Sequence, residues 1–290
     1  MAIFNLGSIN ADLSYSVDAL PEPGETISAH SVSRGLGGKG TNMSVAAARA
    51  AAHVVHIGAV GRDGDWAIER LTEYGVDTRH ITYGSATGHA IIMVDRLGEN
   101  EIVIHSGANL EITENAIGAA LGQSSTGDYF LAQNETNQQF EAASLAKKLG
   151  LTVVYAAAPF DVDAVQKMLP MVDLLVLNQI EADQLQKATG KPPQDLGVAH
   201  VVITLGAKGC RWYNAETGVS KVFDAEPVEA VDTTGAGDTF TGYLVAGLDR
   251  GLAMEQALKL ASRAGAIMVT RHGTADVIPD LKDIQDRFGP

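Results

Sequence analysis

The alternation of short apolar runs with helical patterns after Thr113 constrains the fold more than any other feature of the chain. Each run is four or five residues long, lacks charged side chains and lies between segments with apolar residues at helical spacing. Strands that are apolar throughout belong to parallel sheets with helices on both faces, because both strand faces are buried. We therefore predict an α/β fold with a central, mostly parallel sheet. The predicted strands are Tyr129–Ala132, Thr152–Ala156, Leu174–Leu177 and Val201–Thr204, and the predicted helices are Thr113–Leu121, Gln138–Leu149, Asp161–Leu169, Glu181–Thr189, Thr239–Arg250, Met254–Thr270 and Leu281–Phe288.

The first third of the chain predicts a second, smaller sheet. Ala2–Leu6 is an apolar run that fits a first buried strand, but the region 13–33 alternates in polarity and is broken by prolines and a glycine, which indicates short strands. Thr87–Asp95 and Glu101–His105 flank a glycine-containing turn and predict a hairpin. We expect lid strands inserted at about 12–34 and 87–106 into one domain spanning 1–290. Other predicted elements are helices at 43–52 and 65–74, a strand at 54–57, and a late hairpin of 210–213 with 221–223.

Composition limits the possible partners. The 290 residues, 46% hydrophobic and 19% charged, suit a packed globular domain. A net charge of -14 argues against nucleic acid and anionic membrane surfaces, which both select basic patches. A phosphate-bearing ligand would have to be held by backbone dipoles, a metal ion or a few cations.

We expect a cytoplasmic protein. Cys210 is the only cysteine, which excludes an intrachain disulfide and fits a reducing compartment. The N-terminus shows no signal-peptide pattern, and no window reaches the ~18 consecutive apolar residues of a membrane span.

The stretch Val231–Gly242 is the strongest candidate for chemistry. It predicts an extended run, a flexible Gly235-Ala236-Gly237 turn and a helix that begins near Asp238 or Thr239. Free backbone N–H groups at such a helix start bind anions. A carboxylate beside an anion site needs a further purpose, which Asp238 would have as the base that deprotonates a hydroxyl attacking a phosphoryl group. The alternative is that Asp238 only caps the helix and the glycines only form a tight turn.

Two stretches near the N-terminus are candidates for ligand binding. Asn10 and Asp12 follow the first strand and, two positions apart in an extended segment, point to the same side, where they could bind vicinal hydroxyls. An Asx turn is the alternative. The run Gly35–Asn42 matches a dinucleotide-binding pattern but lacks its acidic residue after the next strand, so a loop that approaches a polar ligand, with Lys39 and Asn42 as donors, fits better.

Two later turns could contact a nucleotide. Asn178 and Glu181 follow a predicted strand and could hold a hydrated Mg²⁺ near phosphates, although the pair taken alone favours an N-cap with a capping-box acid. Thr204–Gly209 is a turn after another strand, which fits either a nucleotide-lining loop or plain turn chemistry.

Three separated motifs together resemble the ribokinase-type (PfkB) sugar kinase family. They are Gly7-Ser8-Ile9-Asn10-Ala11-Asp12, Gly37-Gly38-Lys39-Gly40-Thr41-Asn42 and Asp232-Thr233-Thr234-Gly235-Ala236-Gly237-Asp238-Thr239-Phe240, with Asn178-x-x-Glu181 and Thr270-Arg271-His272-Gly273 also in place. The resemblance extends along nearly the whole chain. It implies a three-layer α/β/α ribokinase-like fold with a small β-sheet lid, and a homodimer formed through the lids.

The resemblance also implies a role for each matching residue. Asp238 would be the catalytic base, and Gly235, Ala236 and Gly237 the anion hole. The sugar would be held by Asn10, Asp12, Gly38, Lys39, Asn42 and Glu135. The nucleotide would lie near Asn178, Thr204, Gly206, Gly209 and Gly237, with Mg²⁺ near Asn178 and Glu181 through water. Potassium would be bordered by Asp232, Thr234, Arg271 and Gly273, largely through backbone carbonyls.

Three positions depart from the pattern of the family. Members commonly have glutamine at the position of Met43, leucine at the position of Asn134, and Asn-Pro-Ala-Pro where this chain has Ala156-Ala157-Ala158-Pro159. The departures leave the phosphoryl-transfer residues intact and concern the choice of sugar.

The expected reaction is transfer of the γ-phosphate of Mg·ATP to the primary 5-hydroxyl of D-ribose, with potassium as an activator. The rivals are a kinase of the same fold for another sugar, a ketose or a nucleoside, a non-catalytic sugar- or nucleotide-binding regulator, and a dinucleotide-dependent oxidoreductase. Asp238 beside an intact Gly-Ala-Gly turn disfavours the regulator, because a pure binder needs no carboxylate beside phosphate.

Overall fold

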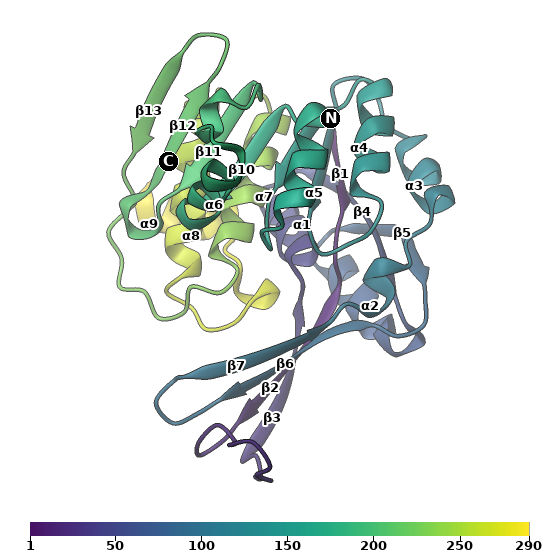
Figure 1. Cartoon of the computed structure of the whole chain (residues 1–290), viewed down its shortest axis with the longest axis vertical. Helices are drawn as coiled ribbons and strands as arrows, with labels where there is room; N and C mark the ends of the chain where they lie inside the picture. The colour runs from purple at the N-terminus through teal and green to yellow at the C-terminus, as the bar shows by residue number, and fades with distance from the viewer. Residues whose placement is uncertain (290) are drawn as a thin grey trace.

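A large twisted sheet lies between two layers of helices in the computed structural model, which describes residues 1–289 (Figure 1). Within that range the sheet has nine strands, of which only the last two pair antiparallel to their neighbours. Their order across the sheet is β13 (Val219–Phe223), β12 (Cys210–Asn214), β11 (His200–Thr204), β10 (Leu174–Asn178), β9 (Thr152–Ala156), β8 (Tyr129–Gln133), β1 (Ala2–Leu6), β4 (His53–Val60) and β5 (Asp77–Tyr83).

The helices divide between the two faces of this sheet according to which core they build. One core joins the sheet to α1 (Lys39–Arg49), α2 (Asp65–Glu73), α7 (Ala236–Asp249), α8 (Met254–Met268) and α9 (Leu281–Phe288). The other joins it to α3 (Glu114–Leu121), α4 (Gln139–Lys148), α5 (Val162–Met168) and α6 (Gln179–Thr189). Successive strand residues contribute to alternate cores, as Ile3 and Phe4 do, so the central strands are apolar throughout. The predicted three-layer α/β/α fold is confirmed.

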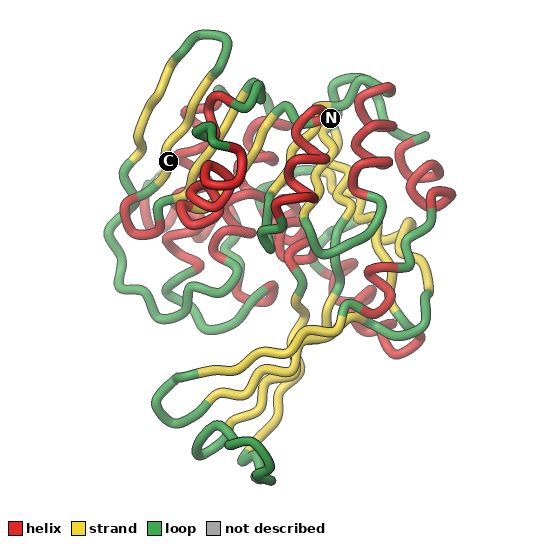
Figure 2. The backbone as a smooth tube through the Cα atoms, in the orientation of Figure 1, coloured by secondary structure: helices red, strands yellow, loops and turns green. Residues whose placement is uncertain are grey.

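A small four-stranded sheet projects from this body and is built from β2 (Asn10–Ser16), β3 (Ser31–Gly37), β6 (Gly88–Val94) and β7 (Asn100–His105) (Figure 2). Its order is β3-β2-β6-β7, with β2 and β6 parallel and both outer pairs antiparallel. Because β2 follows β1 after a short turn, Asn10 lies where the small sheet joins the body. The strand β7 has one unpaired edge and is exposed along its whole length.

The predicted strands and helices after residue 113 are confirmed to within three residues at each end. Before that residue, one strand was not predicted and one helix begins earlier than predicted. The edge strand β5 was not predicted, because Asp77–Tyr83 contains two charged residues and lacks a continuous apolar run. The helix α1 begins at Lys39 rather than at Met43, because Gly38 with φ of 96° completes the turn from β3 in a single residue. Lys39 and Asn42 are therefore helical and not part of a loop.

The dinucleotide interpretation of Gly35–Asn42 is ruled out by the topology. In this chain the strand before the glycines is β3, which lies in the small sheet and pairs antiparallel with β2. A dinucleotide fold requires that strand to be parallel in the main sheet. Over residues 1–289, no helix combines the length and hydropathy required to cross a membrane.

Candidate active site

The predicted site residues gather at the carboxyl ends of the central strands. The chain winds outward from β1 in both directions, to β4 and β5 on one side and to β8 and beyond on the other. At such a switch point the connections diverge and leave a crevice, which is where open α/β sheets hold ligands. Ser8 follows β1, Glu135 follows β8, and Asn178 and Thr204 end β10 and β11.

Asp238 is the most deeply buried acid of the site, with 8% of its surface exposed. It occupies the third position of α7, and its Oδ2 accepts a hydrogen bond of 2.9 Å from Nδ2 of Asn42. Burial raises the pKa of Asp238 above its usual value, although the charge of Lys39 and the bond from Asn42 oppose the rise. The helix cap is Gly235, in the left-handed conformation with φ of 72°, so Asp238 is not the N-cap.

The turn before α7 presents free backbone N–H groups beside this carboxylate. Among residues 1–289 no backbone acceptor lies within hydrogen-bond reach of the Gly235 or Gly237 amide, whereas Ala236 donates to the Thr233 carbonyl at 3.3 Å. The free amides and the helix dipole attract negative charge. An ideal Cβ at Gly237 would meet no atom within 4 Å, so this residue borders open space.

Lys39 and Glu135 face each other at the start of α1. Glu135 accepts hydrogen bonds from the Lys39 backbone N–H at 2.9 Å and from the Ser8 hydroxyl at 2.5 Å. A residue that follows β8 thus caps the start of α1. The negative charge of Asp238 raises the pKa of the Lys39 ammonium, with Glu135 and Glu181 adding to the effect. Lys39 therefore supplies positive charge between three carboxylates.

The polar side chains of Asn10 and Asp12 lie on β2, where the small sheet joins the body and close to Glu135. Oδ1 of Asn10 accepts a bond of 2.7 Å from Asn109, which also accepts from the Ile9 backbone. Burial, with the charge of Glu135, raises the pKa of Asp12 to about 6. The Asp12 carboxylate lies over Gly37 of β3, where a Cβ would come within 2.1 Å of Oδ2, so any side chain at this position would displace the carboxylate.

Two adjoining cavities extend from Asp238 along the carboxyl edge of the sheet. The first, of about 230 Å³, is lined by Lys39, Asn178, Glu181 and Asp238. The second, of about 330 Å³, is mostly apolar and is lined by Gly206, Gly209, Phe240 and the α8 face. Thr204, Thr233 and Gly237 line both. The arrangement suits a ligand with an anionic end beside Asp238 and a flat apolar end further along.

Asn178 and Glu181 form a capping box, as the alternative interpretation predicted. Asn178 Oδ1 accepts from the Glu181 N–H at 2.9 Å, and Glu181 Oε2 accepts from the Asn178 N–H at 2.7 Å. Burial raises the pKa of Glu181. Each side-chain oxygen keeps a free lone pair and Glu181 keeps its second oxygen, so the pair also fits a hydrated Mg²⁺.

The predicted cation residues come together from two segments. Asp232 accepts bonds from the Thr234 N–H at 2.9 Å and from the Gly273 N–H at 3.2 Å. Partial burial acts against ionisation, but these amides hold the pKa of Asp232 below its usual value. The Arg271 side chain turns away to Val277 and Asp283, both at 3.0 Å, so only its backbone can face a cation.

The sequence analysis assigned no role to several residues of the site. Ser8 and Asn109 hold Glu135 and Asn10 in place, and Asn109 lies outside any recognised motif. Loop 225–230 and α8 form a wall of the larger cavity with ordinary small residues, which carry no local signal. Residues 1–289 contain no cluster of three His, Cys, Asp or Glu that could hold a metal.

The departures from the family pattern separate into two groups. Met43, Ala156 and Ala158 line the smaller cavity and therefore affect its shape. Asn134 instead donates to the Pro159 carbonyl at 3.0 Å and accepts from the Tyr155 hydroxyl, which anchors the loop after β9.

Comparisons with known proteins agree with this arrangement. Residues 2–281 match the pfkB family of carbohydrate kinases. The ribokinase of Haemophilus influenzae is 37% identical over 294 residues, which cover 96% of this chain and 95% of that protein. The ribokinase of Thermotoga maritima superposes with a TM-score of 0.87 at 31% identity, covering 98% of this chain and 97% of the other. The Arabidopsis thaliana ribokinase complexed with ribose and ATP superposes with a TM-score of 0.85 at 27% identity, with coverages of 98% and 97%.

Proposed function

The chain belongs to the pfkB family of carbohydrate kinases, and we propose that it is a ribokinase that transfers the γ-phosphate of ATP to the 5-hydroxyl of D-ribose. The observation that carries the proposal is the position of Asp238. This buried carboxylate lies at the end of a cavity, beside the free amides of Gly235 and Gly237, with the polar residues of β2 nearby.

The sugar would bind between the small sheet and the body. Asn10, Asp12, Gly38, Lys39 and Asn42 line this region from β2 and the start of α1, with Glu135 opposite. An ionised Asp12 accepts hydrogen bonds from two vicinal hydroxyls. Asn42 holds Oδ2 of Asp238, which leaves Oδ1 to accept the proton of the attacking hydroxyl. The elevated pKa makes Asp238 a stronger base than an exposed carboxylate.

The transferring phosphoryl group would lie against the start of α7. The amides of Gly235 and Gly237 and the ammonium of Lys39 stabilise negative charge there without reorganising during the reaction. Thr204, Gly206 and Gly209 border the cavity that fits the adenosine end of ATP. Asn178 and Glu181 would hold Mg²⁺ through water, where it supplies charge neutralisation for the phosphates.

We include potassium, a dimer and a cytoplasmic location in the proposal. Asp232, Thr234, Arg271 and Gly273 would border the ion, and the Asp232 carboxylate would attract it from behind the anion-binding turn. The exposed apolar strand β7 suits contact with a second copy of the chain through the small sheets, which would then serve as lids. ATP and a reducing environment are both available in the cytoplasm.

The first test is ADP release by the purified protein with Mg·ATP and potassium. The acceptors are ribose, 2-deoxyribose, fructose, 2-keto-3-deoxygluconate, adenosine and other nucleosides. We expect strong turnover on ribose and little on the others. A preference for another acceptor would keep the mechanism and change the substrate, whereas silence on all of them would support a binding protein.

A further inference from the structure

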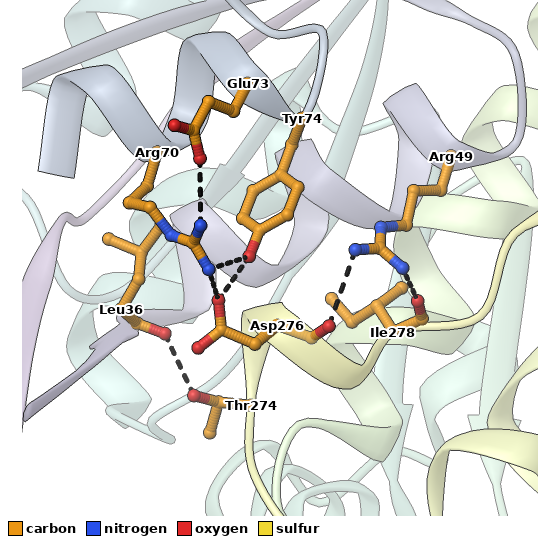
Figure 3. Close-up of polar contacts among 8 residues, drawn as sticks. All are labelled: Leu36, Arg49, Arg70, Glu73, Tyr74, Thr274, Asp276 and Ile278. Atoms are coloured by element: carbon orange, nitrogen blue, oxygen red, sulfur yellow. Dashed lines mark hydrogen bonds and ion pairs between the residues drawn. The ribbon is translucent and has the colours of Figure 1, made fainter. Parts of the chain in front are cut away.

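A cluster of polar side chains outside the site ties the segment 270–278 to α2 (Figure 3). Asp276, in the short helix η6 (Ala275–Val277), accepts hydrogen bonds from Arg70 at 2.6 Å and from the Tyr74 hydroxyl. Arg70 also donates to the Tyr74 hydroxyl at 2.9 Å. The three side chains thus close a triangle between regions 206 positions apart in the sequence.

A second arginine fixes the same segment by its backbone. Arg49 of α1 donates to the Ile278 carbonyl and, at 3.4 Å, to the Asp276 carbonyl (Figure 3). Its guanidinium group lies 5.0 Å from the centroid of the Tyr74 ring, and that of Arg70 lies 5.2 Å from it. Tyr74 is therefore held between two cations. The position of η6 is determined both by the Asp276 side chain and by the backbone carbonyls of Asp276 and Ile278.

The other end of this segment reaches the proposed active site from two sides. The Gly273 N–H donates to the Asp232 carboxylate, three residues before the Gly235-Ala236-Gly237 turn that carries the free amides. The Thr274 hydroxyl donates at 2.9 Å to the Leu36 carbonyl of β3, which is two residues before Gly38. A displacement of η6 would therefore disturb the anion-binding turn and the sugar-binding strand together.

The helix α2 also contacts β3 directly. The Arg34 guanidinium of β3 lies 4.3 Å from the centroid of the Trp66 ring, one helical turn before Arg70. One face of α2 thus holds both the small sheet and the segment 270–278. Neither contact involves a residue that would touch sugar, nucleotide or metal.

We propose that Asp276 is a positioning residue, held by Arg70 and Tyr74, and that it couples sugar binding under the small sheet to the binding of a monovalent cation beside Gly273. The inference rests on the proposed function, since it presumes that the sugar and the cation bind at the places given above. We call the contacts of Asp276 with Arg70 and Tyr74 the clamp. When the clamp is formed, Gly273 and Thr274 are both held in place, so a ligand that orders one of them encounters the other already in position.

The principal test compares Asp276→Asn with Glu73→Gln. Asparagine keeps the shape of Asp276 but loses the charge that holds Arg70 and Tyr74. Glu73 is the matched control, because it also pairs with Arg70, at 2.8 Å, but lies on α2 itself and does not reach η6. In Asp276→Asn we expect the KM for ribose and the potassium concentration for half-activation both to rise on the order of five-fold. The kcat at saturation should stay close to that of the unmodified enzyme, and Glu73→Gln should leave all three values unchanged.

A second variant tests the connection to the small sheet. Thr274→Val removes the hydroxyl bonded to Leu36 and leaves the clamp intact. We expect the same increase in the KM for ribose, together with a normal thermal unfolding midpoint. An unchanged KM in both Thr274→Val and Asp276→Asn would overturn the proposal, as would a loss confined to kcat.

Hydrogen–deuterium exchange of the ligand-free protein supplies a readout that is independent of activity. Peptides covering 270–278 and 34–39 should exchange faster in Asp276→Asn than in Glu73→Gln. Equal exchange in the two variants would show that Asp276 does not hold the segment. If the unmodified protein did not phosphorylate ribose, the proposed function would fail, while this comparison would still decide the role of Asp276.

Discussion

Asp238 combines burial with a single strong hydrogen-bond donor, and both conditions follow from its place in α7. Its pKa is raised by burial, and the bond from Asn42 orients the carboxylate without neutralising it. Asp238→Asn keeps the size of the side chain but removes the proposed base. We expect turnover to fall by roughly 10²-fold or more, while ATP binding and the fold are retained. Steady-state kinetics with a nucleotide-binding titration checks this, and near-normal turnover would exclude Asp238 as the base.

The same group sets a pH dependence. A base acts only when it is deprotonated, so kcat should fall as the pH decreases through the raised pKa of Asp238. That decrease should begin at a higher pH than for an exposed aspartate, whose pKa is about 3.9. A rate that stays constant from pH 7 down to about pH 4 would contradict this assignment.

Asp12 should oppose stability at neutral pH in the ligand-free protein. Its folded-state pKa of about 6 lies above the unfolded value, so the folded state binds the proton more tightly. The stability from this group is present at low pH and is lost as the pH rises through about 6. Asp12→Asn should therefore raise the unfolding midpoint at pH 7.5 while it increases the KM for ribose. Calorimetry and kinetics on the same samples test both parts, and a lower midpoint would refute the electrostatic explanation.

At the scale of the element, the start of α7 has a geometry that suits a ligand better than it suits the helix. Glycine at Gly237 costs helix stability relative to alanine, and the space beside it is open. Gly237→Ala should therefore fold with an equal or higher unfolding midpoint. The new methyl group would project into the space shared by the two cavities, so the KM for ATP should rise and kcat should fall. Gly118→Ala in α3, also in open space, is the matched control and should leave the kinetics unchanged.

The capping box of α6 illustrates how one sequence pattern can serve two purposes. Asn178 and Glu181 satisfy the helix start, as local capping rules require, and they also line the smaller cavity. The sequence presented these as alternatives because the cap is a local property. Only the convergence of β10, α1 and α7 places the same two side chains opposite Lys39 and Asp238.

At the scale of the molecule, β7 is the clearest candidate for contact with a second copy. Ile102, Val103 and Ile104 are consecutive apolar residues, each more than half exposed, on an unpaired edge. Ile104→Lys should shift the protein from dimer toward monomer in sedimentation velocity. Val219→Lys, the same kind of change on the exposed strand β13, is the control and should leave the assembly unaffected. A protein that is monomeric without substitution would rule out the lid dimer.

The sequence alone determined the layers of the fold and the identity of the chemical groups. Apolar runs that alternate with helical patterns permit little besides a sheet covered on both faces, and the strands β8 to β11 were predicted within one residue at each end. The motif residues were likewise recognisable, because a glycine turn before a helix and a carboxylate beside it are local patterns. Local energetics, encoded by neighbouring residues, fix these features.

Only the tertiary structure decided which of these groups meet. Asn42 and Asp238 are 196 positions apart, Asn109 and Asn10 are 99 apart, and Arg70 and Asp276 are 206 apart. Such contacts depend on how whole elements pack, and no periodicity or spacing in the sequence reports that packing. The pKa of Asp12 and the clamp at Asp276 arise in the same way, because burial and charge proximity are properties of the folded chain and not of any single stretch.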